Sequence, residues 1–282
     1  MIVGMSPMTR RVVLGAGAMA TAGGAALAVG ETERGRRWLH VVGVVRGPDL
    51  DPPDVDVAVQ SHALDSDAMR RRVEWSMSVP AVAPTAVVVC LHGRGNTHAY
   101  AFDTIGVQRF VADAGLPWAV ASVDGGEATY WHERADGRDP QAMIFDELLP
   151  AIRRSVGDVP VGLLGWSMGG YGALLATSDR DEVVATAAAS PAIWRRFAQA
   201  TLGAFDSADD FHRHDLFDRA DALRRRAIRI DCGNDDPFRA NAAALADAID
   251  ADAVFTSGFH DAGYWRSRVP AQLTFLAEHL PH

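Results

Sequence analysis

Two patterns of hydrophobic positions follow one another along the chain, and the change lies near Pro84. Residues 73–79 alternate between apolar and polar side chains, and this period of two predicts a strand with one solvent-facing side near a sheet edge. After Pro84, short runs are apolar at every position, which is typical of strands that are buried on both faces. These runs are residues 86–91, 118–123, 161–164, 183–189 and 227–230.

Segments with helical periodicity separate these runs. Residues 102–114 place their apolar side chains on one side of a helix, and a second such stretch begins near Pro140. Strands that are buried on both faces and alternate with helices predict a mostly parallel sheet flanked by helices, which is the α/β class.

Residues 192–226 interrupt this alternation. They combine many charges with five aromatic residues, which are Trp194, Phe197, Phe205, Phe211 and Phe217. The segment is too short for a second domain. We expect a helical cap excursion over the carboxyl edge of the sheet, where α/β proteins form their ligand sites.

The composition narrows the class of protein further. A chain of 282 residues with 48% hydrophobic residues can bury a sizeable core, and its length favours one large domain. All 27 basic residues are arginine, and with 36 acidic residues the formal net charge is −9. Because no stretch concentrates these cations, a nucleic-acid partner is not expected. Cys90 and Cys232 lie inside apolar runs, so we interpret them as buried thiols and not as part of a disulfide framework or a zinc site.

The N-terminus has the pattern of an export signal. Arg10 and Arg11 precede residues 12–30, which carry no charge and are rich in Ala and Gly. This is typical of a twin-arginine signal, and residues 26–28 offer a small-residue cleavage site. We therefore expect export to the cell envelope or beyond, with the segment removed or kept as a weak anchor, and no stable membrane span elsewhere. A leader that is not functional would leave the protein in the cytoplasm.

The same stretch admits a second interpretation. Residues 12–20 also fit a strand followed by G-x-G-x-x-A, the dinucleotide-binding fingerprint. Gly23 and Gly24 would weaken the helix that this motif needs, and no acidic residue ends the next apolar run at residues 38–45. We therefore favour the export signal.

The sharpest chemical signal is an apolar run that leads into G-x-S-x-G and then into a helix of small residues, at 161–172. Ser167 at such a strand-to-helix turn stands clear of the sheet, and side chains at positions 165 and 169 would collide with the neighbours of the turn. The helix N-terminus behind the serine adds N–H groups for a developing negative charge. Ser167 is therefore the candidate nucleophile, and a glycine-rich turn with a bystander serine is the alternative.

A serine nucleophile needs a base and an orienting carboxylate, and in the α/β-hydrolase order the acid precedes the histidine. Asp236 lies in an acidic loop after the apolar run at 227–230, and His260 follows a later short run. Asp235 is the competing acid, whereas Asp231 lies inside the strand pattern and is interpreted as structural. His260 is the candidate base because the other histidines either precede the acid or lie at the end of the chain.

This chemistry also needs N–H donors for an oxyanion. Met168 supplies one from the start of the helix. Residues 86–95 supply a second, since a buried strand that ends in H-G-x-G resembles the donor loop of esterases. We assign the backbone N–H of Arg94, with that of Gly95 as the alternative, and expect the His92 side chain to support the loop by hydrogen bonding.

Four motifs together resemble the putative esterase family of α/β-hydrolases. They are LHGRG at 91–95, GWSMGG at 165–170, CGNDDPF at 232–238 and GFHDAGYW at 258–265. The family includes esterase D (S-formylglutathione hydrolase), feruloyl esterases and secreted mycolyltransferases, and the resemblance covers roughly residues 69–280. It implies an α/β-hydrolase fold with Ser167 as nucleophile, Asp236 as acid and His260 as base. It also implies a small-molecule ester as substrate, and no metal or organic cofactor.

Aromatic residues near these motifs indicate the kind of ester. Trp131, Trp166, Tyr264 and Trp265 are the candidate substrate-binding residues, because aromatic walls favour apolar acyl chains or flat groups. Loop packing is the alternative interpretation for Trp131. We expect a serine esterase that hydrolyses short-to-medium acyl esters through an acyl-enzyme.

Four other interpretations stay open. The same residues could transfer the acyl group to an alcohol, as a mycolyltransferase does, or act on long-chain lipids, as a lipase does. The fold could also serve as an inert binding module, although such a module would not need an intact nucleophile, acid, base and donor loop. His212, His214 and Asp215 have the composition of a metal site, but such a run among charges is more often a solvated face.

The chain therefore divides into three predicted parts. These are a signal segment at residues 1–30, a connector with the first strand at 31–68, and a catalytic domain at 69–282 with the cap excursion at 192–226.

Overall fold

The computed structural model describes residues 32–282, and two compact units divide the chain between Gly47 and Pro48. In the smaller unit, helix α2 spans Glu33–Val41 and begins at Thr32, whose hydroxyl accepts a hydrogen bond from the Gly35 N–H at 3.0 Å. The predicted signal segment lies outside the described residues. The division at residue 47 lies within the segment predicted as connector and first strand.

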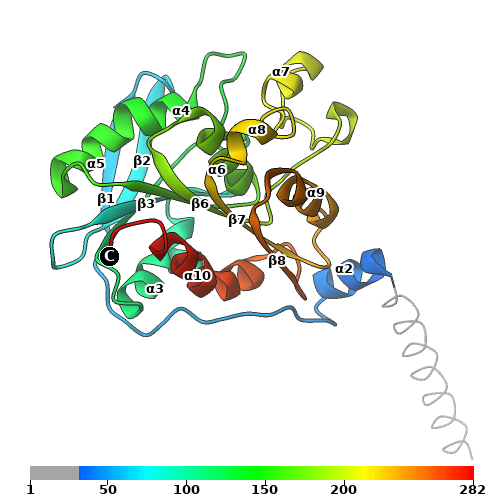
Figure 1. Ribbon diagram of the computed structural model, residues 1–282, viewed down its shortest axis with the longest axis horizontal. Helices are drawn as coiled ribbons and strands as arrows, with labels where there is room; N and C mark the ends of the chain where they lie inside the picture. The colour runs from blue at the N-terminus through cyan, green and yellow to red at the C-terminus, as the bar shows by residue number, and fades with distance from the viewer. Residues whose placement is uncertain (1–31) are drawn as a thin grey trace, which may run out of the picture. The chain divides into compact units, whose positions relative to one another are not determined.

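The larger unit is built on an eight-stranded sheet with the order β1-β2-β4-β3-β5-β6-β7-β8 (Figure 1). The strands are β1 Gln60–Ser66, β2 Arg71–Ser78, β3 Ala86–Leu91, β4 Trp118–Val123, β5 Val161–Trp166, β6 Val183–Ala189, β7 Ala227–Gly233 and β8 Asp252–Thr256. β2 is antiparallel to both β1 and β4, and the other neighbouring strands are parallel. The mostly parallel sheet that the sequence predicts is confirmed.

Strands that are apolar on both faces were the most predictable elements. β3, β4 and β6 begin and end where their apolar runs do, and β5 and β7 continue to Trp166 and Gly233. The prediction for β2 was wrong on one face, because Ser76 and Ser78 are buried like the apolar residues between them. The reason is that helices cover this face too: Ser78 pairs with Val120 of β4, which packs in the same hydrophobic layer as residues of three helical segments. The Ser61 hydroxyl also lies 3.2 Å from that of Ser76.

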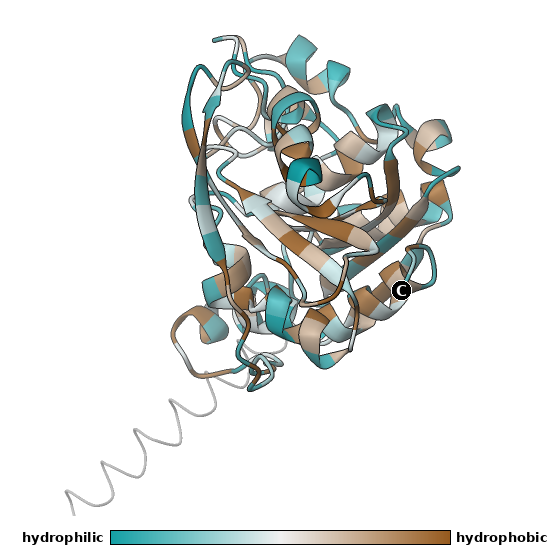
Figure 2. Ribbon diagram, turned by 90° about the vertical axis from the view of Figure 1, so that its left-hand side faces the viewer, coloured by the Kyte–Doolittle hydropathy of each residue, from teal (hydrophilic) through white to brown (hydrophobic). Residues whose placement is uncertain are grey.

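Helices cover both faces of the sheet (Figure 1). One face packs against the π-helical segment η2, α5, α6 and α9, and the other packs against the π-helical segment η1, α3 and α10. Their bounds are α4 Pro140–Ala142, η2 Met143–Leu148, α5 Leu149–Val156, α6 Met168–Asp179 and α9 Arg239–Ile249, then η1 Ala101–Ile105, α3 Val107–Asp113 and α10 Ala262–Ala277. Figure 2 shows the hydrophobic strands enclosed between these two layers.

The helix predicted over residues 102–114 is divided in two. Gly106 has a left-handed backbone with φ of 76°, which a right-handed helix cannot continue, so η1 ends there and α3 begins. The Pro52 ring packs so closely against Gly106 that a Cβ atom would collide with it. The second predicted helix does begin at Pro140, with Asp139 as its N-cap.

The excursion at residues 192–226 lies between β6 and β7 and contains only short helices. These are the 3₁₀ turn η3 Phe197–Gln199, α7 Ala208–Arg213 and α8 Ala220–Leu223. Three of its five aromatic residues, Trp194, Phe205 and Phe211, are buried. The loop before α4 anchors it, because Arg134 donates to the Ala204 carbonyl at 2.9 Å and pairs with Asp206 at 2.6 Å.

Candidate active site

Ser167 lies in the tight turn between β5 and α6. Its backbone is strained, with φ of 55° and ψ of −116°, and the turn lifts its partly exposed hydroxyl above the sheet. A Cβ atom on Gly169 would collide with the Leu91 carbonyl, and one on Gly165 would collide with the Gly169 backbone. The steric reason that the sequence offers for both glycines is therefore confirmed.

The structure brings Ser167, His260 and Asp236 into one hydrogen-bonded line. His260 Nε2 lies 2.9 Å from Ser167 Oγ, and His260 Nδ1 lies 2.8 Å from Asp236 Oδ2. With Asp236 ionised, Nδ1–H donates to the carboxylate and Nε2 is left to accept the serine proton. The three residues follow β5, β7 and β8, so parallel strands deliver them to the same edge of the sheet.

Burial and hydrogen bonding hold the carboxylate in place. Asp236 is fully buried, and its second oxygen accepts the Phe238 N–H at 2.8 Å. The competing acid, Asp235, uses its backbone N–H to bond the Gly258 carbonyl at 3.0 Å, which fastens the acidic loop to the histidine loop. Asp236 is therefore the carboxylate that contacts His260 Nδ1 directly.

Asp231 has a structural environment, as its place in the strand pattern indicates. It is fully buried, and its carboxylate accepts hydrogen bonds from Arg229, Arg268 and Gln272 at 2.9–3.1 Å. Because Arg268 and Gln272 belong to α10, this cluster fastens α10 to β7.

Two backbone N–H groups near Ser167 are unused within the described part of the chain. The N–H groups of Arg94 and Met168 donate to no protein acceptor there, whereas that of Gly95 bonds the Glu127 carbonyl at 2.9 Å. A Cβ atom built on Gly93 would lie 3.6 Å from that of Ser167, so the loop after β3 runs against the serine. Of the two donors considered for this loop, only Arg94 has its N–H available.

His92 holds this loop in place. The Gly125 N–H donates to its Nε2 at 3.1 Å, so Nε2 carries no proton and the Nδ1–H donates to the Gly93 carbonyl at 2.8 Å. Burial lowers the pKa of His92, which favours this neutral tautomer. The supporting role expected for the side chain agrees with these bonds.

The four aromatic residues expected to line the ester site lie in the core. Trp131, Trp166 and Tyr264 are fully buried, and Trp265 is nearly so. Trp166, Tyr264 and Trp265 pack in the hydrophobic layer under η1 and α10, and Trp131 packs in the layer on the opposite face of the sheet. Only Trp265 reaches the line of hydrogen bonds, with its ring centre 5.2 Å from that of His260. Burial removes the other three from contact with an incoming substrate.

Sequence reasoning missed Phe238. This half-buried residue places its ring centre 5.3 Å from that of His260. Its position two residues after Asp236, in the same motif, was the available signal.

The residues that lie together as possible metal ligands differ from the set His212, His214 and Asp215 that the sequence offers. His214 lies with His132 and Asp210, which come from the loop before α4 and from α7, and the ligand atoms of this group lie within 4.8 Å of one another. The Nδ1 atoms of both histidines lie 2.8–2.9 Å from backbone carbonyls, and His132 Nε2 lies 3.0 Å from that of Ala204. Burial, together with the neighbouring His214, lowers the pKa of His132 to about 4. A neutral imidazole carries one N–H, so His132 donates to only one of the two carbonyls. The group brings α7 next to the loop before α4, since His132 Nδ1 lies 4.0 Å from Asp210 Oδ1.

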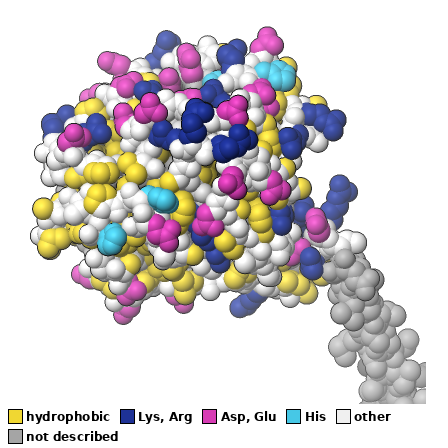
Figure 3. Space-filling view, viewed as in Figure 1, with side chains coloured by type: hydrophobic (Ala, Val, Ile, Leu, Met, Phe, Trp, Pro, Cys, Tyr) yellow, Lys and Arg dark blue, Asp and Glu magenta, His cyan; other side chains and the backbone are white. Residues whose placement is uncertain are grey.

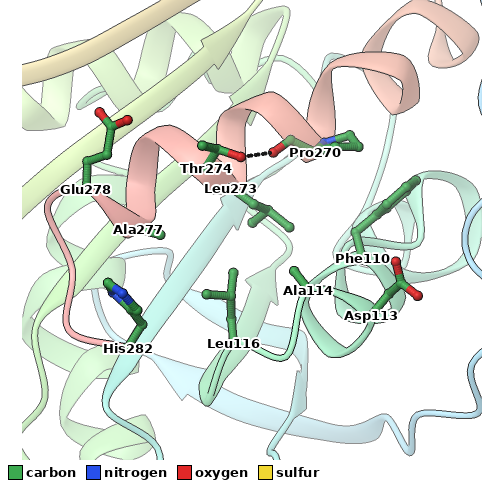
Figure 4. A pocket seen from close by; sticks show the side chains of 10 residues that line it. All are labelled: Phe110, Asp113, Ala114, Leu116, Pro270, Leu273, Thr274, Ala277, Glu278 and His282. Carbon is green, nitrogen blue, oxygen red and sulfur yellow. Dashed lines mark hydrogen bonds between the residues drawn. The ribbon is translucent and has the colours of Figure 1, made fainter.

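A cavity of about 520 Å³ lies far from Ser167, between α3 and α10 (Figure 4). Leu116, which lines it, precedes β4 and so marks the amino edge of the parallel strands, whereas Ser167 follows β5 at the carboxyl edge. The cavity is therefore separate from the line of hydrogen bonds.

The sheet order and a strained serine turn after β5 together define an enzyme of the α/β-hydrolase class. A family profile described as "Putative esterase" matches residues 66–276. The chain belongs to this family and is a carboxylic ester hydrolase.

Several solved structures have the same fold. They include a ferulic acid esterase (TM-score 0.67, 19% identity, 79% of this chain and 98% of that chain), the serine hydrolase FphF of Staphylococcus aureus (0.67, 17%, 78% and 98%) and MPT51 (FbpC1) of Mycobacterium tuberculosis (0.60, 14%, 79% and 99%). Comparison with curated protein sequences found no match.

Proposed function

We propose that the chain hydrolyses carboxylic esters through an acyl-enzyme on Ser167. His260 takes the hydroxyl proton as Ser167 Oγ attacks the ester carbonyl, and it then protonates the leaving alcohol. Asp236 holds the imidazole tautomer and stabilises the charged ring. A water molecule, activated by the same histidine, then releases the acid and restores the serine.

The N–H groups of Arg94 and Met168 bind the negative oxygen of the tetrahedral intermediate in this mechanism. Two fixed N–H dipoles, already oriented before the reaction, stabilise charge that develops only in the transition state. The unused state of both donors beside Ser167 supports this assignment.

The observation that carries the proposal is the line from Ser167 Oγ through His260 to the buried Asp236, with distances of 2.9 and 2.8 Å. A binding module would have no need to keep a strained serine, a base and a buried carboxylate in hydrogen-bond contact.

We further propose short-to-medium acyl esters as the substrates. The half-buried Phe238 has its ring centre 5.3 Å from that of His260 and offers apolar contact to a short acyl chain, and the helices of the excursion between β6 and β7 are all short. The likeness of the fold to that of a ferulic acid esterase supports an ester substrate.

Hydrolysis of 4-nitrophenyl esters with two to sixteen acyl carbons tests this proposal. We expect kcat/KM to be greatest for short-to-medium chains and to fall steeply for the longest. A maximum at sixteen carbons would contradict the proposed substrate class and favour a lipase. Product analysis with an added alcohol acceptor would reveal acyl transfer, and a fluorophosphonate that fails to label Ser167 would favour an inert binding module.

A further inference from the structure

Exposed apolar side chains gather on α2 and on the turn that follows it, in the smaller unit. The exposed fractions are 58% for Trp38, 82% for Val41, 49% for Val42 and 63% for Val44. Val41 and Val42 lie one helical turn after Trp38, so the three side chains share one face. The turn is held against the helix, because the Val44 N–H donates to the Leu39 carbonyl at 2.8 Å. Single apolar residues are common on protein surfaces, whereas four within seven residues form a candidate contact surface.

The same segment is basic in an acidic protein. Residues 32–47 hold four arginines and one glutamate, whereas the whole chain has a net charge of −9. Arg34 is exposed and lies one turn before Trp38, and Arg37 lies three residues after Arg34, at the edge of the same face. Arg37 also pairs with Glu33 at 3.2 Å, but an ion pair this exposed contributes little. The apolar face is therefore flanked by cations.

An anionic lipid surface matches both properties of this segment. The headgroup layer of a bilayer accommodates tryptophan and aliphatic side chains beside the acyl chains, and its phosphates attract arginine. The apolar stems of the arginines can lie along the same face while their guanidinium groups reach the phosphates. An acidic protein surface would match the arginines and would leave the apolar side chains unburied.

The length of α2 decides how it could meet a bilayer. Its nine residues span about 14 Å, less than half of the hydrocarbon core of a bilayer, which is about 30 Å thick. A helix of this length can lie in the headgroup layer but cannot cross the membrane.

We propose that residues 33–44 bind an anionic lipid surface, with the Trp38 face in the headgroup layer and the flanking arginines at the phosphates. The segment follows the uncharged stretch at 12–30, so it adds a second membrane contact if that stretch is kept and replaces it if that stretch is removed. The inference does not depend on the proposed chemistry of Ser167.

Co-sedimentation of the full chain with lipid vesicles tests this proposal. We expect binding to vesicles of phosphatidylcholine mixed with an equal amount of phosphatidylglycerol, and at least about tenfold weaker binding to phosphatidylcholine alone. Arg34→Gln combined with Arg37→Gln should weaken binding to the mixed vesicles by about tenfold. The matched control is Arg153→Gln combined with Arg154→Gln, an equal change of charge in α5, which should leave binding unchanged.

Trp38 reports on the contact itself. Bromine atoms on lipid acyl chains quench a tryptophan that enters the bilayer, and the six other tryptophans of the chain are buried. In mixed vesicles with brominated phosphatidylcholine, we expect the wild-type fluorescence to be quenched. Trp38→Phe keeps an aromatic ring at this position, so it should still sediment with the vesicles but show no quenching.

Several results would overturn the proposal. Sedimentation without quenching of Trp38 would show that another part of the chain binds the lipid. Equal binding to both kinds of vesicle, or unchanged binding of the Arg34 and Arg37 variant, would remove the role of charge. A Trp38 that acrylamide does not reach without vesicles, and that stays unquenched with them, would show that protein covers this face. Hydrolysis of 4-nitrophenyl butyrate should be the same in all these variants, so a protein without esterase activity would contradict only the proposed function.

Discussion

At the scale of single residues, the account depends on which carboxylate contacts the base. Asp235 and Asp236 are adjacent and both buried, but only Asp236 lies 2.8 Å from His260 Nδ1. The Phe238 N–H bonds its other oxygen, so the carboxylate cannot turn away. A neutral amide at this position could present its NH₂ group to Nδ1 and favour the wrong tautomer of the imidazole.

We therefore expect Asp236→Asn to lower kcat on a 4-nitrophenyl ester by about 10³- to 10⁴-fold. Asp235→Asn is the matched variant, and it should lower kcat by less than about tenfold, since it leaves the bond between Asp236 and His260 Nδ1 in place. Steady-state kinetics of both variants, with folding checked by circular dichroism, measure the difference. The reverse order of losses would move the role to Asp235.

At the scale of elements, a strained turn supports the loop that carries Arg94. Tyr130 and Trp131 both have positive φ, 51° and 59°, in the loop between β4 and α4. The Trp131 ring fits only because Gly125 and Gly172 lack a Cβ atom, and its Nε1–H donates to the His92 carbonyl at 3.2 Å. The turn therefore links α6 to the segment that precedes Arg94.

Trp131→Phe removes this donor and keeps an aromatic ring. We expect kcat to fall about 10- to 100-fold with little change in KM, because small displacements of groups that act in the transition state are costly. Trp118→Phe is the control: Trp118 is equally buried and also donates to a carbonyl, that of Pro281 at 2.7 Å, away from the site.

Each variant loses one hydrogen bond, which should lower its unfolding free energy by about 1 kcal/mol. Thermal unfolding of both proteins checks that the two variants are destabilised equally. Equal kcat values for Trp131→Phe and Trp118→Phe would contradict a positioning role for Trp131.

At the scale of the whole molecule, the features to explain are the surface charge and the cellular location. On the face of the larger unit that Figure 3 shows, arginine and carboxylate side chains are interspersed. Among residues 32–282, no helix is long and apolar enough to cross a membrane. We propose export by the twin-arginine route, and its support is the sequence of Arg10 and Arg11 with the uncharged stretch after them.

Replacing both of these arginines with lysine should therefore abolish recovery of the protein outside the cytoplasm, since the paired arginines are the recognised feature. The same double change at Arg153 and Arg154, an adjacent pair in α5, should leave export unchanged. Fractionation followed by N-terminal sequencing measures the outcome, and a cleaved protein should begin near Val29. Undiminished export of the Arg10 and Arg11 variant would contradict the proposal.

Sequence reasoning succeeded where one local requirement decides the structure. β3 and β6 were predicted to the residue because a strand covered on both faces tolerates few polar side chains. The spacing around Ser167 was readable for a similar reason, since only glycine fits at 165 and 169.

It failed where distant segments decide the environment. The sequence shows that Trp131 is aromatic, but the space that buries its ring depends on Gly172 of α6 as well as on Gly125 of its own loop. His214 is paired with His132, which belongs to another loop, and no local pattern could have joined them. The break at Gly106 was missed because the apolar periodicity continues through it.

Turnover of 4-nitrophenyl butyrate by Ser167→Ala tests the central claim most directly, with Ser178→Ala as a control. Ser178 lies near the end of α6, the helix that follows Ser167, and its hydroxyl bonds the Leu175 carbonyl within that helix, so its loss leaves the site intact. The account predicts that Ser167→Ala lowers kcat by at least about a thousandfold while Ser178→Ala stays near the wild type. Near-normal turnover by a folded Ser167→Ala protein would contradict it.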